Sequence, residues 1–132
     1  MSQENVEVVR RMSDEWGLGE ISQASIRSVY HPDVEFLPLR AATEGAYRGI
    51  AGIERFVADT QEVFEKFEPR FELRDLGERV LAWGTIHVRA RQSGIDTEIA
   101  TGGVFEFRDG KIVRWQDFGS KDKALAAVGL AE

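Results

Sequence analysis

Hydrophobic residues in the first half of the chain recur at spacings of three and four, the pattern of amphipathic helices. The first stripe, which Gly17 and Gly19 end, consists of Val6, Val9, Met12 and Trp16. A short second helix is expected from Ser22 to Tyr30, because Pro32 disfavours helical geometry at the residue before it. After Gly49, a third helix is predicted from the stripe Ile53, Phe56, Val57, Val63 and Phe64.

The second half alternates between hydrophobic and polar positions, as β-strands do. One short strand at 34–37 precedes the third helix, and four longer strands follow it at 69–76, 79–92, 95–108 and 111–118. Their turns are Gly77-Glu78, Ser93-Gly94 and Asp109-Gly110. Asp-Gly is a strong hairpin signal because a type I′ turn needs positive φ at both central positions. Ser120 is expected to cap a short C-terminal helix.

Helices followed by an antiparallel meander predict one α+β domain over residues 1–132. Three N-terminal helices are expected to pack in the concavity of a strongly curved, mostly antiparallel sheet. A sheet that bends around helices leaves a cavity between the two layers. We therefore expect a container for a small, hydrophobic molecule.

Two-residue turns allow the pairing of the last three strands to be counted, and register decides which side chains share a face. The count places Phe107 opposite Ile112 and Phe105 opposite Arg114. The predicted inner face is almost wholly apolar, with glycines that leave room, and comprises Val80, Ala82, Gly84, Ile86, Val88, Ala90, Ile99, Thr101, Gly103, Phe105, Phe107, Ile112, Arg114, Gln116 and Phe118.

The predicted outer face carries His87, Asp117 and an expected ion pair between Arg89 and Glu98. It also gathers an apolar and aromatic patch formed by Trp83, Val104 and Trp115. Such a patch usually marks an interface, so we expect a homodimer through this outer sheet face. A bulge in the last strand that turns the patch inward is the alternative.

Composition narrows the functions. A net charge of −6 argues against nucleic acid as a partner, and no apolar run approaches the ~20 residues of a membrane span. The polar, acidic start indicates no signal peptide, and a cytoplasmic location is expected. With zero cysteines and two histidines far apart, neither a metal site nor a disulfide is expected. No cofactor-binding motif is present.

Arg114 is the most informative candidate, because an isolated charge on an apolar face is very costly. Its partner is either a helix carboxylate such as Asp14 or Glu15, or an anionic or carbonyl-bearing ligand. The other candidate ligand-binding residues are Trp16, Tyr30, Tyr47, Phe56, Thr101, Phe105 and Gln116. Each also has a structural reading: core packing for the large apolar rings, anchoring for the tyrosines, and satisfaction of backbone groups for the rest.

Several segments resemble one known family when taken together. They are the amphipathic start at 4–12, His31-Pro32-Asp33-Val34-Glu35-Phe36, Tyr47-Arg48-Gly49, and the segments at 105–114 and 124–130. This combination resembles the SnoaL-like branch of the nuclear transport factor 2-like superfamily. The resemblance implies a cone-shaped α+β barrel and, commonly, a dimer through the outer sheet face. The family includes polyketide cyclases, ketosteroid isomerases and epoxide hydrolases, and the fold alone does not determine which of these activities a member has.

Few residues on the predicted inner face of the sheet match the catalytic residues of the family. In the cyclases an acidic cavity residue acts as a base, but the counted register puts the matching Asp117 outside. Tyr30 could match the isomerases' tyrosine, yet no acidic residue is on the predicted inner strand face. Arg114 could match the arginine of the hydrolases' Asp-Arg-Asp set, whose aspartates are not evident. The family often has Ala-His where this chain has Gly102-Gly103.

The sequence thus indicates a small-molecule-binding protein with an apolar cavity. If it is an enzyme, we expect an isomerase, cyclase or hydrolase that works by proton transfer or hydration without a cofactor. The base is not identified. The alternative is a non-catalytic ligand-binding or dimerisation module. An open cavity with Asp117 or His87 inside would favour an enzyme, and a filled cavity would favour the module.

Overall fold

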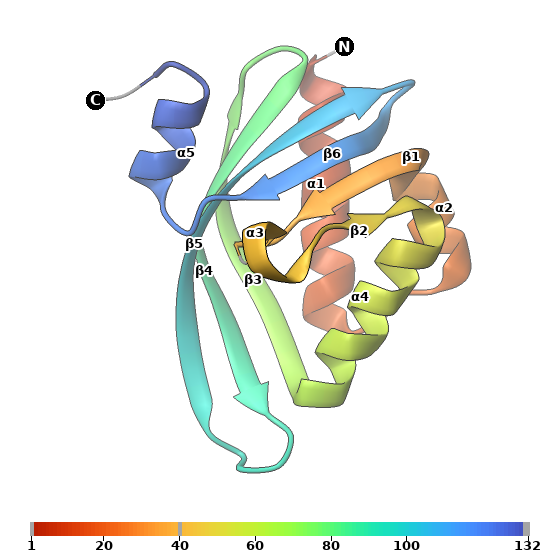
Figure 1. Ribbon diagram of the computed structural model, residues 1–132, viewed down its shortest axis with the longest axis vertical. Helices are drawn as coiled ribbons and strands as arrows, with labels where there is room; N and C mark the ends of the chain where they lie inside the picture. Colours follow the sequence, from red (N-terminus) through yellow and green to blue (C-terminus); the bar gives the residue numbers. More distant parts are fainter. Residues whose placement is uncertain (1, 40, 131–132) are drawn as a thin grey trace.

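A strongly curved, six-stranded sheet organises the described residues, 2–39 and 41–130, of this computed structural model (Figure 1). The helices are α1 (Ser2–Leu18), α2 (Gln23–Val29), α3 (Ala41–Glu44), α4 (Gly49–Val63) and α5 (Lys121–Ala127). The strands are β1 (Tyr30–Leu37), β2 (Tyr47–Arg48), β3 (Phe64–Asp75), β4 (Arg79–Ala90), β5 (Asp96–Arg108) and β6 (Lys111–Asp117). The predicted α+β class is confirmed, with the short α3 as an additional helix.

The strand order is β2-β1-β6-β5-β4-β3, so the N-terminal strand β1 pairs with the C-terminal strand β6. That pairing is parallel and the others are antiparallel, which makes the sheet mixed. Figure 1 shows α1, α2 and α4 on one side of the sheet and α5 on the other. None of the described helices is both long and apolar enough to cross a membrane.

Hydrophobic side chains fill both sides of the sheet. On the concave side, the α1 stripe packs with Ile53 of α4 and Phe105 of β5, both fully buried. On the convex side, Leu125 of α5 packs against Leu81 and Val104. Ser120 caps α5, as predicted, by accepting a hydrogen bond from the Lys123 N–H. The two clusters explain why the middle strands are apolar on both faces.

Three predicted boundaries are wrong. Tyr30 starts β1 instead of ending α2, and Phe64 starts β3 instead of completing the α4 stripe. The turn between β4 and β5 is longer than the predicted two residues: the Ala90 N–H donates to the Ile95 carbonyl, so four residues, 91–94, lie between this hydrogen-bonded pair. The β4–β5 register is consequently shifted by two, which keeps every side chain on its predicted face but pairs Arg89 with Asp96 instead of Glu98.

A β-bulge in β6 overturns the predicted faces of the last strand. Phe107 lies opposite Ile112, as counted, but Phe105 lies opposite Trp115 instead of Arg114. Val113 is the extra residue, and after it every side chain points to the other face. Stacking explains the outcome: the Trp115 ring lies 4.0 Å from that of Phe36 and 5.2 Å from that of Phe105. Without the bulge, the guanidinium of Arg114 would be buried in place of the Trp115 ring, which is energetically costly.

The two inner glycines do not both leave room. A Cβ at Gly84 would lie 2.2 Å from the Arg70 carbonyl oxygen, and Gly84 has φ of +148°, which other residues rarely adopt. Gly84 therefore allows a close approach between β4 and β3. Gly103, in contrast, lines the cavity described below.

Candidate functional site

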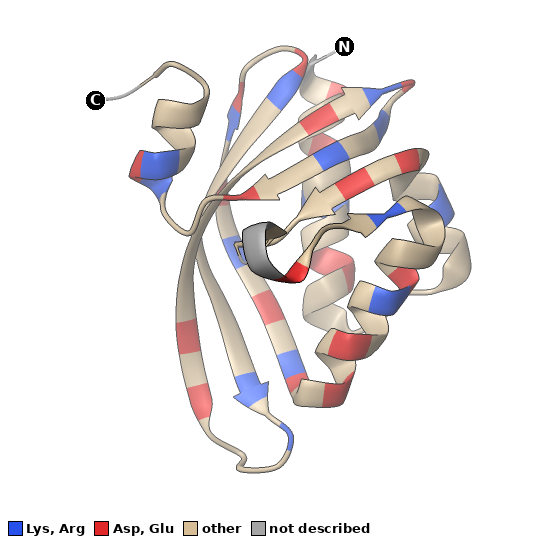
Figure 2. Ribbon diagram, viewed as in Figure 1, with Lys and Arg blue, Asp and Glu red and all other residues tan. Residues whose placement is uncertain are grey.

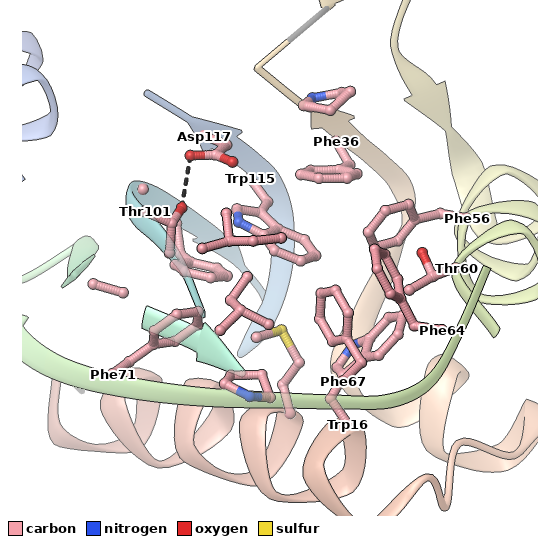
Figure 3. Close-up of a pocket in the computed structure, with 18 residues that line it drawn as sticks. Trp16, Phe36, Phe56, Thr60, Phe64, Phe67, Phe71, Thr101, Trp115 and Asp117 are labelled. Carbon is pink, nitrogen blue, oxygen red and sulfur yellow. Dashed lines mark hydrogen bonds between the residues drawn. The ribbon is translucent and has the colours of Figure 1, made fainter. Parts of the chain in front are cut away.

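A cavity of about 240 Å³ lies between the concave face of the sheet and helices α1 and α4 (Figure 3). Its wall is largely aromatic and includes Trp16, Phe36, Phe56, Phe64, Phe67, Phe71, Phe105 and Trp115. Ile99, which also lines the cavity, is 41% exposed and marks a side that opens to solvent. An apolar enclosure with few polar groups is the usual form of a small-molecule site.

Among the described residues, Asp117 is the one carboxylate that lines this cavity. The Thr101 hydroxyl and the Gly119 backbone N–H both donate to its Oδ1, each at 2.8 Å (Figure 3). Both bonds go to the same oxygen, so the carboxylate is held in one orientation while Oδ2 receives no hydrogen bond from the described residues. Oδ2 is thus available to accept a proton or a hydrogen bond from a ligand.

Two hydrogen-bond donors in the cavity wall also lack a partner among the described residues: the Trp115 indole N–H and the Thr60 hydroxyl. Among the described residues, no side-chain nitrogen or oxygen is both fully buried and without a hydrogen bond. Both donors consequently face open space. The Trp115 Nε1 lies 3.6 Å from where a Cβ on Gly103 would be, and Gly103 pairs with Asp117 across the two strands. A donor and a proton acceptor therefore occupy the same end of the cavity.

A general base needs an unshared oxygen within reach of the proton that it removes, in a place from which bulk water is largely absent. Asp117 meets the first condition, and the aromatic wall on the other sides limits the water that reaches it. The adjacent indole N–H is suited to an oxygen that gains negative charge when the proton leaves. This end of the cavity can therefore support proton transfer without a cofactor.

Residues 9–115 match the family model of the SnoaL-like domain. The chain belongs to this family. No curated protein sequence matches the chain, but many solved structures resemble it.

Three structures illustrate the likeness of this SnoaL-like domain to solved ones. The provisionally assigned SnoaL-like polyketide cyclase of Jannaschia sp. CCS1 is 23% identical with a TM-score of 0.77, and the match covers 98% of this chain and 92% of that one. TerC, co-crystallised with polyporic acid, is 25% identical with a TM-score of 0.74 and coverages of 96% and 97%. An epoxide hydrolase of Mycobacterium tuberculosis is 16% identical with a TM-score of 0.72 and coverages of 97% and 94%.

Four of the eight residues predicted to bind a ligand line the cavity of the SnoaL-like domain: Trp16, Phe56, Thr101 and Phe105. Arg114 and Gln116 do not, because the bulge places them on the convex face. The same shift brings in Trp115 and Asp117, which the counted register put outside. The sequence of β6 contains a signal for this shift. Ile112 and Trp115 are apolar, Arg114 and Gln116 are polar, and only a bulge between Ile112 and Arg114 allows both apolar side chains to be buried and both polar ones to be exposed.

The two tyrosines lie beside the cavity but do not line it. Tyr30 is buried in the core, and this burial raises the pKa of its phenol far above the ordinary value. Tyr47 stacks on Phe36 at 6.0 Å and donates a hydrogen bond to Asp59. Partial burial, and then the nearby Asp59 carboxylate, raise the pKa of Tyr47. Both side chains support the aromatic wall from behind.

Arg114 pairs across the sheet with Glu35 of β1 and Glu106 of β5, and Glu35 pairs with Arg48 of β2. Figure 2 shows the resulting alternation of red and blue bands across the four strands. The Arg114 guanidinium lies 3.5 Å from a Glu35 carboxylate oxygen and 3.6 Å from one of Glu106, and Glu35 also forms an ion pair with Arg48. The predicted helix partners, Asp14 and Glu15, are thus wrong. These pairs hold β6 against β1 and β5 just after the bulge, which makes Arg114 a structural residue.

Replacing Arg114 with Met is expected to lower the free energy of unfolding by about 1 kcal/mol, because two partly exposed ion pairs are lost. Urea denaturation measures this change. The matched control is Arg10→Met, which breaks a single exposed pair with Glu7 on α1 and should have a smaller effect. Neither variant should change the affinity for an aromatic probe such as 2-tetralone. Weaker binding in Arg114→Met alone would contradict the structural role.

The outer patch predicted for dimerisation is not an exposed patch. Trp115 faces the cavity, and Val104 is only 7% exposed because α5 covers it. The Lys121 Nζ of α5 lies over the Trp83 ring, 4.7 Å from its centroid. His87 lies on this convex face, as counted, where its Nε2 is 3.3 Å from an Asp96 oxygen. It therefore does not contribute a base to the cavity.

Proposed function

We propose that this SnoaL-like domain binds a small hydrophobic carbonyl compound in its aromatic cavity and catalyses cofactor-independent proton transfer, with Asp117 as the general base. One observation carries this proposal: a carboxylate inside an apolar, solvent-accessible cavity has one oxygen fixed by two donors, while the other has no partner among the described residues. Isomerisation and cyclisation both begin with such a step, so either overall reaction is compatible with it.

The step itself is simple. The C–H bond next to the substrate carbonyl breaks, its proton moves to Asp117 Oδ2, and its electron pair delocalises to give an enolate. The Trp115 indole N–H donates to the enolate oxygen, which carries the negative charge. Return of the proton from Asp117 to the same or another carbon completes an exchange or an isomerisation. In a cyclisation the enolate carbon instead attacks a second carbonyl, whose oxygen becomes an alkoxide and takes the proton back from Asp117.

The names of similar structures support this class of reaction. One is assigned as a polyketide cyclase, and another was crystallised with polyporic acid, which indicates that this fold can hold an organic acid. The hydrolase reaction is less well supported. Arg114, the residue that could match the arginine of the epoxide hydrolases, lies on the convex face and not in the cavity.

We expect the protein to accelerate hydrogen–deuterium exchange at the carbons next to the carbonyl of 2-tetralone. Proton NMR in D₂O follows this exchange, with buffer and heat-denatured protein as controls. Binding is measured separately by quenching of tryptophan fluorescence, since Trp16 and Trp115 both line the cavity. Binding without accelerated exchange would contradict the enzymatic proposal and favour the non-catalytic ligand-binding module.

A further inference from the structure

We infer that the cavity has a second polar end, at which the Thr60 hydroxyl binds another oxygen of the substrate. The expected ligand is a planar, fused-ring carbonyl compound with a hydroxyl or carbonyl oxygen at the end opposite its reacting carbon. This inference rests on the proposed function only for the identity of the reacting end. The subsite itself depends on Thr60.

The environment of Thr60 is the first observation. Thr60 lies in α4 and is 8% exposed, yet its hydroxyl makes no hydrogen bond with any described residue. No sealed and unbonded side-chain oxygen is present among the described residues, so the hydroxyl faces open space although the rest of the side chain is buried. A hydroxyl that is accessible in the middle of an apolar wall is free to bond a partner from outside the chain. A threonine in a helix often satisfies its hydroxyl with the carbonyl four residues earlier. Here no such bond is present.

The position of Thr60 is the second observation. Figure 3 shows Thr60 on the α4 side of the cavity, across from Thr101 and Asp117 on the strands. Among the side chains that line the cavity, these three carry the hydroxyl and carboxyl groups, and aromatic rings separate Thr60 from the other two. The cavity is therefore polar at both ends and apolar between them.

The size of the cavity limits what can span these ends. An apolar cavity of about 150 Å³ binds benzene, so 240 Å³ accommodates a larger ring system. Flat rings suit walls made of stacked and tilted aromatic side chains. A two-ring compound with its carbonyl near Trp115 and Asp117 would direct the far edge of its second ring toward Thr60.

Water is the competing partner for the Thr60 hydroxyl. A surface pocket of about 250 Å³ adjoins the cavity and shares Trp16, Thr60, Phe64 and Phe67 with it, while Gln61 and Arg91 form part of its outer wall. Water from this pocket could reach the hydroxyl. In that case Thr60 would contribute equally to the binding of every ligand, whether or not the ligand has a second oxygen.

The test compares 2-tetralone with 6-hydroxy-2-tetralone, which adds a hydroxyl at the opposite end of the fused rings. Dissociation constants come from tryptophan quenching with the wild-type protein, Thr60→Val and Thr60→Ser. The added hydroxyl should strengthen binding roughly tenfold in the wild type and in Thr60→Ser, as one hydrogen bond to a buried partner would. In Thr60→Val, which keeps the shape but loses the hydroxyl, this preference should disappear.

Two other outcomes contradict the inference. An equal preference in Thr60→Val and the wild type would show that the second oxygen is bound elsewhere. Equal weakening of both probes in Thr60→Val would show that water satisfies the hydroxyl. Asp117→Asn separates this test from the proposed function: the preference for the hydroxylated probe should persist in Asp117→Asn even though proton exchange is lost. A preference without any exchange in the wild type would leave the Thr60 subsite intact and overturn the catalytic role of Asp117.

Discussion

Replacing Asp117 with Asn should slow the exchange of 2-tetralone about 10³-fold, within the range that a positioned general base provides. Asparagine keeps the size of the side chain and can still accept the hydrogen bonds from Thr101 and Gly119, but its amide cannot take a proton at neutral pH. Binding of the probe should change by no more than about twofold, because the loss belongs to the transition state. Proton NMR and fluorescence quenching measure the two effects on the same samples.

Two further variants sharpen this result. Thr101→Val removes one donor to Oδ1 and should slow exchange about tenfold, since the carboxylate keeps its charge but loses part of its orientation. Asp122→Asn changes an exposed carboxylate on α5, outside the cavity, and should leave exchange unchanged. If Asp117→Asn retained a tenth or more of the wild-type rate, another group would have to be the base.

Replacing Gly102 with Ala is expected to lower the free energy of unfolding by about 3 kcal/mol, the upper part of the usual range for overpacking. A Cβ at this position would lie 2.2 Å from the Ser120 carbonyl oxygen and 2.7 Å from the Lys121 nitrogen. Both atoms belong to backbone, which cannot move aside as a flexible side chain can. The segment before α5 must therefore lift from the sheet and loosen the packing of Leu125 against Leu81. Urea denaturation measures the change in stability, and amide hydrogen exchange reports on α5.

The neighbouring glycine is the matched control. A Cβ at Gly103 would meet its nearest atom, the Gln116 carbonyl oxygen, at 3.0 Å, so Gly103→Ala should cost about 1 kcal/mol. Because Gly103 lines the cavity, this variant should instead weaken the binding of 2-tetralone, whereas Gly102→Ala should not. Similar losses of stability in the two variants would contradict the close contact between Gly102 and the α5 segment.

Local patterns were sufficient to predict most of the fold. The α1 stripe, the capping role of Ser120 and the Asp109-Gly110 turn depend on a few neighbouring residues, and all three are present. The longer turn around 91–94 was missed because Ser93-Gly94 also fits a two-residue turn. That error had little effect on the faces, since a shift of two residues restores the alternation of a strand.

The candidate site was harder to predict, because a bulge is decided by packing between distant segments. Trp115 is drawn inward by Phe36, which is nearly 80 residues earlier in the chain and lies next to it in the parallel β1–β6 pair. The polar and apolar pattern around Val113 is compatible with a bulge, but it does not identify Phe36 as the residue that Trp115 contacts. Thr60 was missed for a related reason: a threonine in an amphipathic helix is unremarkable until the α4 face is known to border a cavity.

The bulge at Val113 also separates the turn from the site. Asp109-Gly110 determines pairing only as far as Ile112, and beyond Val113 the position of β6 depends on β1 and on the row of charges around Arg114. The strand thus contains two sets of residues that could line the cavity. The bulge selects Trp115 and Asp117, and a regular strand would select Arg114 and Gln116. A relative that lost the bulge but kept the chain length would convert an anionic cavity into a cationic one. In such a relative, Arg114 and Gln116 would face the cavity and would favour acidic ligands, without a change at any inward position of the other strands.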